Sequence, residues 1–293
     1  MISELAVVVT TRNEEGNVGK CLRSVSGWVD QVFVIDSENT DRTVEIAREY
    51  AEVVTLPYEE GKIIPWIFQW GLEHLPFRNE WVLILEADQE VTPELRRELQ
   101  TLLARKDIQE SGFYIRRKQM FRGKWIRHGG YGSKYLLKLF RRSVSRLDPE
   151  EEDTRVYVDG RTAKLGAWLV EDNAKEREIL FYLEKHIRYA RAFAREEQRR
   201  RKSGMQFKTQ PRFPGTPDQK VLWMKSIYYR LPLYIRPALY FFYRYFILLG
   251  FLDGKTGFVF HFLQSFWFRL VVDVRLEELL KSEAHPAERM TES

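Results

Sequence analysis

The chain has 293 residues, a length that fits one large domain or one domain with a sizeable appendage. With 44% hydrophobic residues it can bury a substantial core, which excludes a disordered chain, a coiled coil and a collagen-like chain. A single cysteine, Cys21, excludes a disulfide framework and any metal site built from several cysteines, and it fits a reducing compartment. The net charge of +5 does not by itself indicate nucleic-acid binding.

Aromatic residues are unevenly distributed along the chain. Residues 223–268 contain 17 of the 41 Phe, Trp and Tyr residues. The longest uncharged stretch there, 256–268, has 13 residues, whereas a membrane span needs about 18. The N-terminus lacks the basic start and apolar run of a signal peptide. We therefore expect a cytoplasmic protein whose chain does not cross a bilayer.

The first part of the chain alternates strand-like and helix-like segments. The predicted strands are 5–11, 31–35, 51–56 and 81–85, and the predicted helices are 18–29, 41–50 and 67–75. A further helix should open at Thr92, Pro93 and Glu94, since an N-cap, a proline and an early acid are typical of a helix start. This order predicts an α/β fold with a mostly parallel, doubly wound sheet. Ligands of such sheets bind beyond the carboxyl ends of the strands.

The pattern changes in the second part. Residues 112–169 have the pattern of shorter strands with basic residues, and 173–201 that of one long charged helix. A turn-rich linker over 210–217 precedes the aromatic segment. The sequence contains no internal repeat, Walker-type loop or G-x-G-x-x-G motif.

Polar residues follow three of the four predicted strands. They are Thr10 to Glu14 after the first, Asp36 after the second, and Glu86 and Asp88 after the fourth. Turns favour Asp and Asn, so each motif taken alone is compatible with an ordinary exposed turn. Glu86 and Asp88, however, are two apart on extended chain and face the same side. Two such carboxylates suit a hard divalent cation, which in turn suits a diphosphate.

With these motifs the chain resembles the family 2 glycosyltransferases, which have the GT-A fold, a Rossmann-like nucleotide-binding half joined to an acceptor-binding half. The residues that carry the resemblance are Val9 to Glu15, Ile35 to Ser37 with Thr40 to Thr43, and Leu85 to Asp88. Further segments resemble a bacterial subgroup associated with surface polysaccharide and exopolysaccharide. They are Gln69 to Leu72, Trp125 to Gly130, Glu171 to Lys175, Glu184 to His186 with Tyr189 and Ala190, and Leu249 to Lys255.

The resemblance implies a role for each strand end. The segment Thr11, Arg12, Asn13 and Glu14 would line the nucleotide pocket, and Asp36 would contact the base or the ribose.

At the fourth strand end, Asp88 would bind Mg²⁺ or Mn²⁺, with Glu86 beside it and Ala87 between them in the same pocket. The family more often has Asp-x-Asp followed by Glu, whereas this chain has Glu86, Ala87, Asp88 and Gln89. The longer arm of Glu86 could shift the metal distance, so Asp88 is the more secure ligand.

An inverting transfer needs a general base that takes the proton of the acceptor hydroxyl, while a metal stabilises the departing diphosphate. The acidic run Glu150 to Thr154 stands where the subgroup has a short acidic motif, so Asp153 is the first candidate base and Glu152 the second. The alternative is an acidic solvated loop. The subgroup usually has His where Thr154 stands, which leaves the register open.

His128 is a further candidate, since in GT-A enzymes a downstream His can complete the metal shell or face the diphosphate. Gly129 and Gly130 would let the backbone approach a ligand closely. A turn histidine with a satisfied hydrogen bond is the alternative. A basic cluster around it could hold phosphates of the donor or of a lipid-diphosphate acceptor, or form a solvated face; its members are Arg116, Arg117, Lys118, Arg122 and Lys124.

The aromatic C-terminus allows several interpretations. It could form a buried helical hairpin or a homodimer interface, or an amphipathic element at a membrane surface, with Arg and Lys meeting anionic lipid. Aromatic and basic residues also suit single-stranded nucleic acid, but no RNA-binding motif accompanies them, so no nucleic-acid partner is expected.

Taken together, the sequence predicts an inverting, metal-dependent glycosyltransferase that moves a sugar from a nucleotide-diphosphate donor, UDP being the first choice, to a membrane-anchored saccharide. The acceptor would be polyprenyl-diphosphate-linked or lipopolysaccharide-type, met at the inner leaflet by a cytoplasmic, peripheral protein. Residues 1–110 would bind the nucleotide-sugar, 111–205 the acceptor, and 206–293 would be linker and amphipathic helices. The alternative is a catalytically degenerate binding protein of the same fold.

Overall fold

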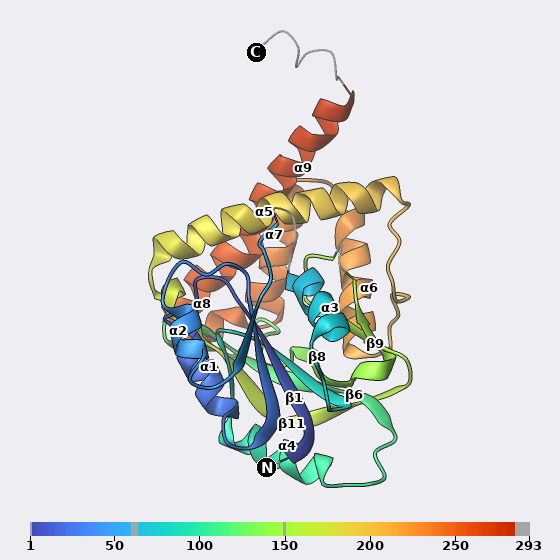
Figure 1. Cartoon of the computed structure of the whole chain (residues 1–293). Helices are drawn as coiled ribbons and strands as arrows, with labels where there is room; N and C mark the ends of the chain where they lie inside the picture. The colour runs from blue at the N-terminus through green and yellow to red at the C-terminus, as the bar shows by residue number, and fades with distance from the viewer. Residues whose placement is uncertain (1, 60–63, 149–150, 285–293) are drawn as a thin grey trace. The chain divides into compact units, whose positions relative to one another are not determined.

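The computed structural model describes residues 2–59, 64–148 and 151–284. The chain divides into two compact units (Figure 1), and each is described by itself. The first unit runs to residue 127 and then from 131 to 177, and the second comprises 128–130 and the chain from 178 onward.

The first unit is built on a mixed sheet. Its strand order is β3-β2-β1-β4-β8-β6-β11-β5, with β7 paired to β6. The strands of the first part are β1 (Ile2–Thr11), β2 (Val29–Asp36), β3 (Glu52–Thr55) and β4 (Trp81–Glu86), and these four are parallel. Their existence and order follow the prediction from buried β-branched runs.

The rest of the sheet is mixed, because β11 (Arg161–Glu171) runs parallel to β6 (Glu110–Phe121) while the other pairings there are antiparallel. This corrects the prediction of a mostly parallel sheet. Strand β8 (Tyr135–Arg141) runs antiparallel to both β4 and β6 (Glu110–Phe121), and β5 (Gln89–Val91) runs antiparallel to β11 (Arg161–Glu171). A two-residue turn at Arg122 and Gly123, with φ of 51° and 78°, folds β7 (Lys124–Ile126) back onto β6. Two positive φ values are typical of the tight hairpin turn, so no crossover helix is needed there. The α/β class itself is confirmed.

Helices cover both faces of this sheet. Along β1, Val7 and Val9 belong to one core cluster and Val8 to the other, because successive strand residues point to opposite faces. The first cluster also contains residues of α1 (Val18–Val25), α2 (Thr43–Ala47) and α4 (Pro93–Leu103), and the second contains residues of α3 (Ile64–His74). A small second sheet pairs β9 (Ser145–Leu147) with β10 (Val156–Val158).

Helix starts and ends follow local chemistry. The Thr92 hydroxyl accepts the Leu95 N–H at 3.2 Å and Pro93 opens α4, as predicted. Helix α1 ends at Val25 rather than at residue 29, because Gly27 has a φ of 77°, a left-handed conformation that breaks the helix.

The second unit is helical. Its α-helices are α5 (Ile179–Lys202), α6 (Pro217–Arg230), α7 (Ile235–Phe242), α8 (Gly254–His261) and α9 (Phe268–Ala284). Two π-helical turns, Tyr243–Ile247 and Phe262–Trp267, and a 3-10 turn, Gly250–Asp253, connect them. Helices α5 and α9 share a small core that includes Ala190, Ala194 and Val272.

A buried ion cluster lies inside this unit. The Arg236 guanidinium is fully buried and donates to both oxygens of Glu197 at 2.8 and 2.9 Å and to Asp273 Oδ1 at 2.8 Å. Arg201 donates to Glu197 Oε1 at 2.7 Å, so two guanidiniums face two carboxylates. Buried charges require such pairing, because an unpaired one would shift its pKa or unfold the region.

The helical run Gly250–Glu283 has 34 residues and is long and apolar enough to cross a membrane, by length and composition alone. The prediction of no crossing rested on uncharged stretches, and Lys255 and Arg269 interrupt the apolar sequence without ending the helix. One such helix is weak evidence for a span, since core helices of soluble proteins have the same properties.

Candidate active site

The carboxyl ends of β1, β2 and β4 meet at one edge of the sheet. Thr11 pairs with Asp36 on β2, and Thr10 pairs with Glu86 on β4. Parallel strands bring their carboxyl ends to the same edge. The structure therefore brings together the three strand-end motifs that the sequence singles out.

The loop after β1 is joined to the loop after β2 by Asn39. Its side-chain amide donates to Thr11 Oγ1 at 2.9 Å, and its backbone N–H donates to Asp36 Oδ1 at 2.8 Å. Asn13, whose φ of 54° is left-handed, accepts the Thr40 N–H at 2.7 Å. Asn39 is not among the site residues predicted from the sequence, although an Asn that follows a strand-end Asp is a typical turn residue.

Arg12 forms a flat cationic surface beside this loop. Its guanidinium carbon lies 3.1 Å from the ring centroid of Tyr58, which is itself 41% exposed. A guanidinium stacked on an aromatic ring offers a plane on which another planar group can stack. This geometry suits the expected contact with a nucleotide, which stays a prediction.

Glu86 lies in a network of buried polar groups. The ammonium of Lys138, 1% exposed, lies 3.3 Å from Glu86 Oε1. The Gln89 amide donates to Glu171 Oε2 at 2.8 Å and to Glu86 Oε1 at 3.4 Å, while its oxygen accepts the Glu86 N–H at 3.2 Å. Arg117 completes the network with an ion pair of 2.7 Å to Glu171.

This network explains the departure from the common acidic motif. A glutamate in place of Gln89 would put a third carboxylate between Glu86 and Glu171, and like charges at that distance oppose ionisation. The amide of Gln89 instead donates a hydrogen bond to both neighbouring carboxylates. Burial alone would raise the pKa of Glu171, but the charge of Arg117 and the Gln89 hydrogen bond outweigh it and hold that pKa well below its usual value.

The segment Glu171 to Lys175 clamps Asp88 to the loop after β1. The Asp172 N–H donates to the Asp88 carbonyl at 3.0 Å, and Asn173 Nδ2 donates to Asp88 Oδ2 at 3.2 Å. Lys175 Nζ lies 2.7 Å from Glu14 Oε1. From the sequence, this segment is predicted only by its resemblance to the subgroup, without a role for any of its residues.

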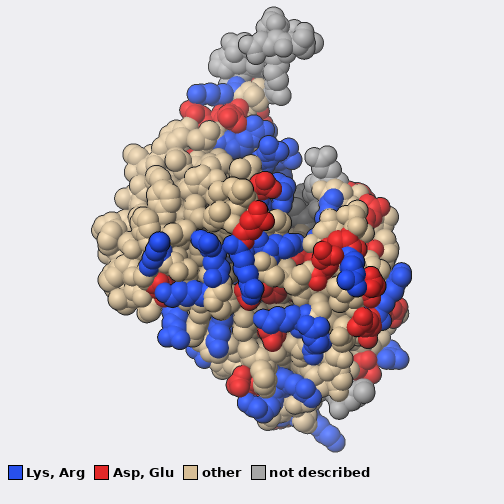
Figure 2. Space-filling view, turned by 90° about the vertical axis from the view of Figure 1, so that its left-hand side faces the viewer, with Lys and Arg blue, Asp and Glu red and all other residues tan. Residues whose placement is uncertain are grey.

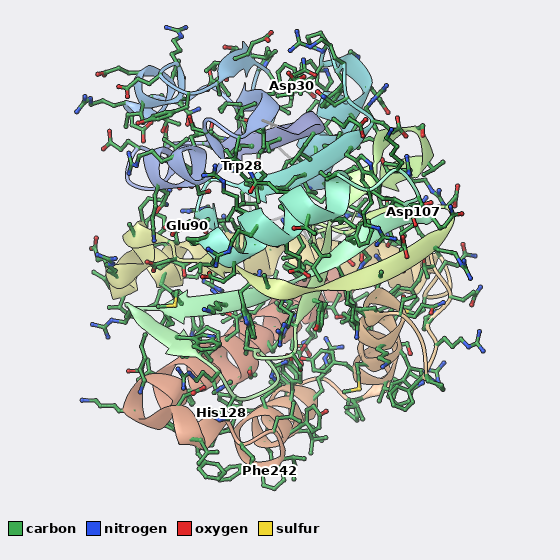
Figure 3. All side chains as sticks on the ribbon, turned by 90° about the horizontal axis from the view of Figure 1, so that it is seen from below. Trp28, Asp30, Glu90, Asp107, His128 and Phe242 are labelled. Atoms are coloured by element: carbon green, nitrogen blue, oxygen red, sulfur yellow. The ribbon has the colours of Figure 1, made fainter. Side chains whose placement is uncertain are left out.

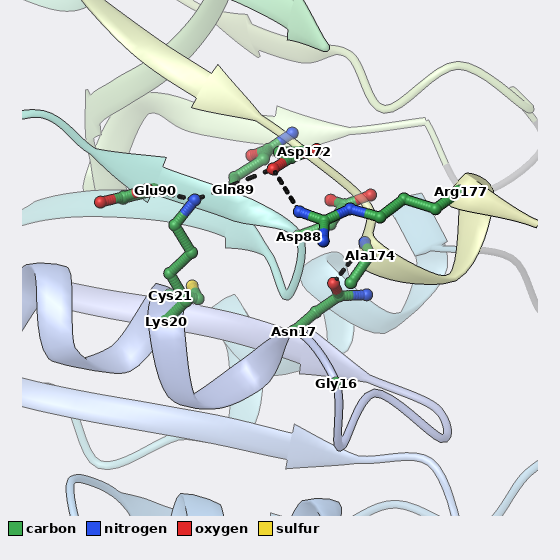
Figure 4. A pocket seen from close by; sticks show the side chains of 10 residues that line it. All are labelled: Gly16, Asn17, Lys20, Cys21, Asp88, Gln89, Glu90, Asp172, Ala174 and Arg177. Atoms are coloured by element: carbon green, nitrogen blue, oxygen red, sulfur yellow. Dashed lines mark hydrogen bonds and ion pairs between the residues drawn. The ribbon is translucent and has the colours of Figure 1, made fainter. Parts of the chain in front are cut away.

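A cavity of about 210 Å³ opens next to Asp88 (Figure 4). Its lining residues are Gly16, Asn17, Lys20, Cys21, Asp88, Gln89, Glu90, Asp172, Ala174 and Arg177. Sites for drug-sized ligands have about 300–1,000 Å³, so this cavity can hold part of a nucleotide-sugar but not all of it. Burial, and then the Asp88 and Glu90 carboxylates, raise the pKa of the Cys21 thiol, which therefore stays protonated and is no nucleophile.

Asp172 is the carboxylate that shares this cavity with Asp88. It is 17% exposed, and its Oδ2 lies 3.7 Å from Arg177 Nη2 and 3.9 Å from Lys20 Nζ (Figure 4).

The acidic run that the sequence singles out for the base lies elsewhere in the first unit. Within it, Glu151 is buried and accepts hydrogen bonds from Arg155 Nε at 3.2 Å and from the Tyr157 hydroxyl at 2.6 Å. Asp153 is 44% exposed and lies 3.7 Å from Arg155 Nη2. Neither Asp153 nor Glu152 lines the cavity beside Asp88, and Glu150 is outside the described residues.

The sequence model described as glycosyl transferase family 2 matches residues 6–157, more than half of the chain. The chain belongs to glycosyl transferase family 2. An uncharacterized glycosyltransferase of Rickettsia typhi is 31% identical over 104 residues, which are 35% of this chain and 34% of that relative. The chain thus spans about a third of the length of the curated relatives it matches.

Two solved structures are similar at low identity. TarS residues 1–349 of S. aureus, in complex with UDP-GlcNAc, is 14% identical, with a TM-score of 0.44 over 96% of this chain and 92% of that chain. The glucosyl-3-phosphoglycerate synthase of Mycobacterium tuberculosis, in complex with Mn²⁺, UDP and glucosyl-3-phosphoglycerate, is 23% identical, with a TM-score of 0.30 over 41% of this chain and 45% of that chain. Because both TM-scores are low, the roles proposed below rest on the chain's own residues.

The cavity chemistry suits a divalent cation. Its lining side chains include three carboxylates (Asp88, Glu90 and Asp172) and two cations (Lys20 and Arg177), one net negative charge. Among the described residues, no three His, Cys, Asp or Glu side chains converge as a preformed metal site. Mg²⁺ is commonly bound by one or two carboxylates together with substrate phosphates, so Asp88 fits, whereas Glu86 faces the Lys138 ammonium.

His128, labelled in Figure 3, belongs to the second unit. Within that unit its ring contacts Asp253. Its Nδ1 lies 2.8 Å from Asp253 Oδ1, and its side chain is 37% exposed. The hydrogen bond of an ordinary turn histidine is thus present, and a partly exposed ring edge remains.

Proposed function

We propose that this family 2 chain is a glycosyltransferase of GT-A fold that uses a nucleotide-diphosphate sugar, UDP-sugars first, and a divalent cation, Mg²⁺ or Mn²⁺. The observation that carries the proposal is the cavity at the carboxyl end of β4, where Asp88 and Asp172 face Lys20 and Arg177. One net negative charge there favours a cation, and a cation favours a diphosphate.

In this proposal, separate residues hold the cation and fix the two loops beside it. Asp88 would hold the cation, which supplies charge stabilisation for the departing diphosphate. Asn173 fixes one Asp88 oxygen, and Lys175 fixes the loop of Asn13 and Glu14 that would line the nucleotide pocket. Both loops are therefore held before any donor binds, so little conformational freedom has to be lost on binding.

The inverting transfer proposed here requires a base for the acceptor hydroxyl. Asp153, with Glu152 second, is the choice from sequence position. The geometry favours Asp172, because it is a mostly buried carboxylate in the cavity that contains Asp88, whereas Asp153 is 44% exposed beside Arg155.

Two matched variants separate these candidates. Asp172→Asn should reduce transfer by about a hundredfold or more, in the range of general-base catalysis, and leave UDP affinity within about twofold. Asp153→Asn should then retain transfer. The opposite pattern would restore Asp153 as the base, and loss of UDP binding in Asp172→Asn would indicate a structural role.

The activity itself is tested by release of UDP, GDP or dTDP from a panel of the corresponding nucleotide-sugars with Mn²⁺. Release should vanish in Asp88→Ala and on addition of EDTA, while the exposed-site control Glu94→Ala should be unaffected. Full turnover in Asp88→Ala would refute the metal assignment. No release from any donor would favour a degenerate binding protein.

We also propose that the second unit binds a membrane surface that carries the acceptor. Between residues 231 and 272 the chain has one acidic residue, Asp253, which is 4% exposed, and four basic residues, of which Arg236 is fully buried. The exposed large apolar side chains of this region are Tyr234, Ile235, Leu239, Phe242, Phe246, Ile247, Leu249, Phe251, Leu252, Phe258 and Phe262. Phe242 projects outward from the helices (Figure 3).

Charge and composition support an anionic lipid surface as the partner. Figure 2 shows a broad area without charged side chains on one face, with Lys and Arg along its edge and some Asp and Glu among them. Exposed aromatic and aliphatic side chains accompanied by cations are typical of interfacial helices. An apolar patch of this size marks an interaction site in a soluble protein. An acceptor anchored in lipid, as in surface polysaccharide synthesis, would be met there.

Vesicle binding tests this second proposal. Phe242 and Phe246, 54% and 47% exposed, have ring centroids 5.1 Å apart, and changing both to serine should abolish sedimentation with phosphatidylglycerol vesicles. Leu180→Ser, at an equally exposed position of α5, is the control and should bind as before. Unchanged sedimentation together with loss of a dimer would show that the surface is a homodimer interface instead.

A further inference from the structure

Cations and tryptophans alternate along one face of the sheet in the first unit. Arg116 and Lys118 belong to β6, Trp125 to β7 and Trp168 to β11, and Arg127 follows β7. The guanidinium carbon of Arg116 lies 4.2 Å from the ring centroid of Trp168, and that of Arg127 lies 4.4 Å from the ring of Trp125. The Lys118 ammonium lies near both rings, 5.0 Å from Trp125 and 5.7 Å from Trp168. We call these five side chains the cation–tryptophan ladder.

The register of the strands explains why these side chains share a face. Arg116 pairs with Trp168 across β6 and β11. Lys118 stands two residues further along β6 and therefore points to the same side as Arg116. Arg117, between them, points to the opposite face, where it pairs with Glu171 at 2.7 Å. The basic cluster that the sequence shows is thus divided, because Arg117 belongs to the buried network at the end of β4.

A bulge in β11 fixes Trp168 beside Arg116. The pairing of β11 with β6 shifts between Lys164 and Trp168. The two oxygens of Glu98 accept two backbone N–H groups of this bulge, each at 2.8 Å. The Gly166 carbonyl accepts the Arg116 Nε–H at 3.2 Å. Bulges are typical beside functional sites, where they aim a side chain, and this one holds its part of the ladder before any ligand binds.

The ladder gathers three positive charges without carboxylate partners. No Asp or Glu of the described residues forms an ion pair with Arg116, Lys118 or Arg127. Arg127 is exposed, and the other four side chains are partly exposed. An aromatic ring attracts a cation through its electron-rich face and leaves the charge of that cation unneutralised. Three such cations together favour an anionic ligand, since guanidinium and ammonium groups form charge-assisted hydrogen bonds with phosphate and carboxylate.

The strand that contains Trp168 leads to the base favoured above. Asp172 follows β11 directly and stands four positions after Trp168. At about 3.3 Å per residue of extended chain, the two positions lie about 13 Å apart. A short oligosaccharide spans this length. An acceptor whose hydroxyl lies at Asp172 can therefore reach the ladder with a further sugar unit of the same molecule.

We propose that the cation–tryptophan ladder binds an anionic group, a phosphate or a carboxylate, on the saccharide acceptor. The ladder then selects an acidic saccharide over a neutral one. This inference rests on the proposed glycosyltransferase function and names the chemical class of its acceptor. All five side chains belong to the first unit, so the proposed site lies within one unit.

Calorimetry on the full chain without a donor tests the binding and needs no transfer activity. The charged probes are trigalacturonate, which carries carboxylates, and pentamannose phosphate. Maltotriose is the neutral sugar, and inorganic phosphate is the free anion. At least one charged saccharide should bind with a dissociation constant below about 1 mM, and the two comparison probes about tenfold more weakly. Added salt should weaken the binding of the charged saccharide, because it screens exposed charges.

Two matched double variants show which cations bind the anion. Lys118→Gln with Arg127→Gln removes two cations of the ladder and should weaken binding about tenfold, the effect of two exposed ion pairs. Arg122→Asn with Lys124→Gln removes two cations at the neighbouring hairpin turn. This control should leave the affinity within about twofold, since salt screens charges that do not contact the ligand. Asparagine is used at Arg122 because the φ of 51° there is left-handed.

The variant Trp125→Leu tests the contribution of the rings. It keeps every charge but removes the ring beside Lys118 and Arg127, so the affinity for the charged saccharide should fall about threefold to tenfold. Trp168→Leu, which removes the ring beside Arg116, is the second variant of this kind. Circular dichroism checks that each variant is folded. An unchanged affinity in the folded variants would show that the rings only pack, and would overturn the role of the ladder.

Any of four further results would overturn the proposal. They are no binding of either charged saccharide, equal binding of maltotriose, equal binding of inorganic phosphate, and an equal loss of affinity in the two double variants. Tighter binding of oligothymidine than of either charged saccharide would also overturn it, in favour of a nucleic-acid site. The proposed function fails separately. A chain that binds the charged saccharide through the ladder but releases no nucleoside diphosphate from any donor would be a saccharide-binding protein without transfer activity.

Discussion

At the residue scale, Gln89 allows the carboxylates of Glu86 and Glu171 to lie close together at the end of β4. It is fully buried and donates to Glu86 and Glu171 at once, while Lys138 and Arg117 neutralise these two carboxylates from the other side. The sequence shows the departure from the common motif but not its compensation, because Lys138 is 52 positions from Glu86 and Glu171 is 82 positions from Gln89 along the chain.

We expect Gln89→Glu to destabilise the chain by about 1–3 kcal/mol at pH 7, since a buried hydrogen bond becomes a repulsion. The loss should shrink as the pH falls, because protonation of the new carboxyl restores a donor toward Glu171. Urea unfolding at pH 7 and pH 5 measures both effects. Gln109→Glu, at an exposed position, is the control. An equal loss at both pH values would contradict this explanation.

At the element scale, the sequence predicted the first four strands and the start of α4 because their signals are local. Buried β-branched runs and the Thr92 cap need no distant partner to be recognised. The long charged helix was predicted from residue 173, whereas α5 begins at Ile179. Residues 173 and 174 are hydrogen-bonded to Asn17 instead, and no local pattern reveals a partner that far away.

The choice of the general base likewise depends on contacts that no local sequence pattern reveals. Two acidic motifs, around Asp153 and around Asp172, stand before or after strands and have similar local character. Only the folded chain shows that Asp172 lines the cavity with Asp88, while Glu151 of the other motif is buried against Arg155 and Tyr157. Choosing between them requires the pairing of β11 with β5, which is a long-range property.

Helix α3 packs closely on β2 through Gly71. A Cβ at this position would lie 2.7 Å from Ile35 Cδ1. Gly71→Ala should therefore be destabilising, since overpacking costs about 1–3 kcal/mol and we expect it to exceed the gain of about 1 kcal/mol in helix propensity. Adding Ile35→Val should restore stability by removing the contacted methyl group. Chemical unfolding of the two variants tests this, and a double variant no better than Gly71→Ala would contradict it.

The ion cluster of the second unit predicts a large single-site effect. Arg236→Met would leave Glu197 and Asp273 buried with one guanidinium fewer, and removing one partner of a buried pair costs about 3–5 kcal/mol. Arg275→Met, which breaks the exposed pair with Glu278, should cost less than about 1 kcal/mol. Thermal unfolding of both variants compares the two costs. Equal midpoints would show that the cluster does not stabilise the fold.

At the scale of the whole molecule, the two units should respond to acid in different pH ranges. Burial, and then the charge of Arg244, lower the pKa of His261 to about 4, while Asp253 acts in the opposite direction and His128 in the same one. The unfolded chain therefore binds this proton first, and the contribution of neutral His261 to stability is lost as the pH falls from about 6.5 toward 4. The low pKa of Glu171 has its effect below about 4.5.

We therefore expect the second unit to open before the first on acidification. Hydrogen exchange read by mass spectrometry at pH 7, 5.5 and 4.5, with rates corrected for pH, should show loss of protection in 250–262 before loss in β4 and β11. His261→Gln should remove the part of the pH dependence that lies above pH 4.5. Loss of protection in both units over the same range would contradict the assignment.

Three residues from the first half of the sequence, His128 to Gly130, belong to the second unit. On the ribosome, His128 emerges about 130 residues before His261, the ring on which its neighbour Gly129 packs. At the usual rate of synthesis that gap lasts on the order of ten seconds. During this interval the nascent chain contains residues 128–130 without the residues that they contact in the folded protein. A fragment that ends at residue 177 would keep this loop but lack Leu248, Asp253 and His261, its partners in the complete chain.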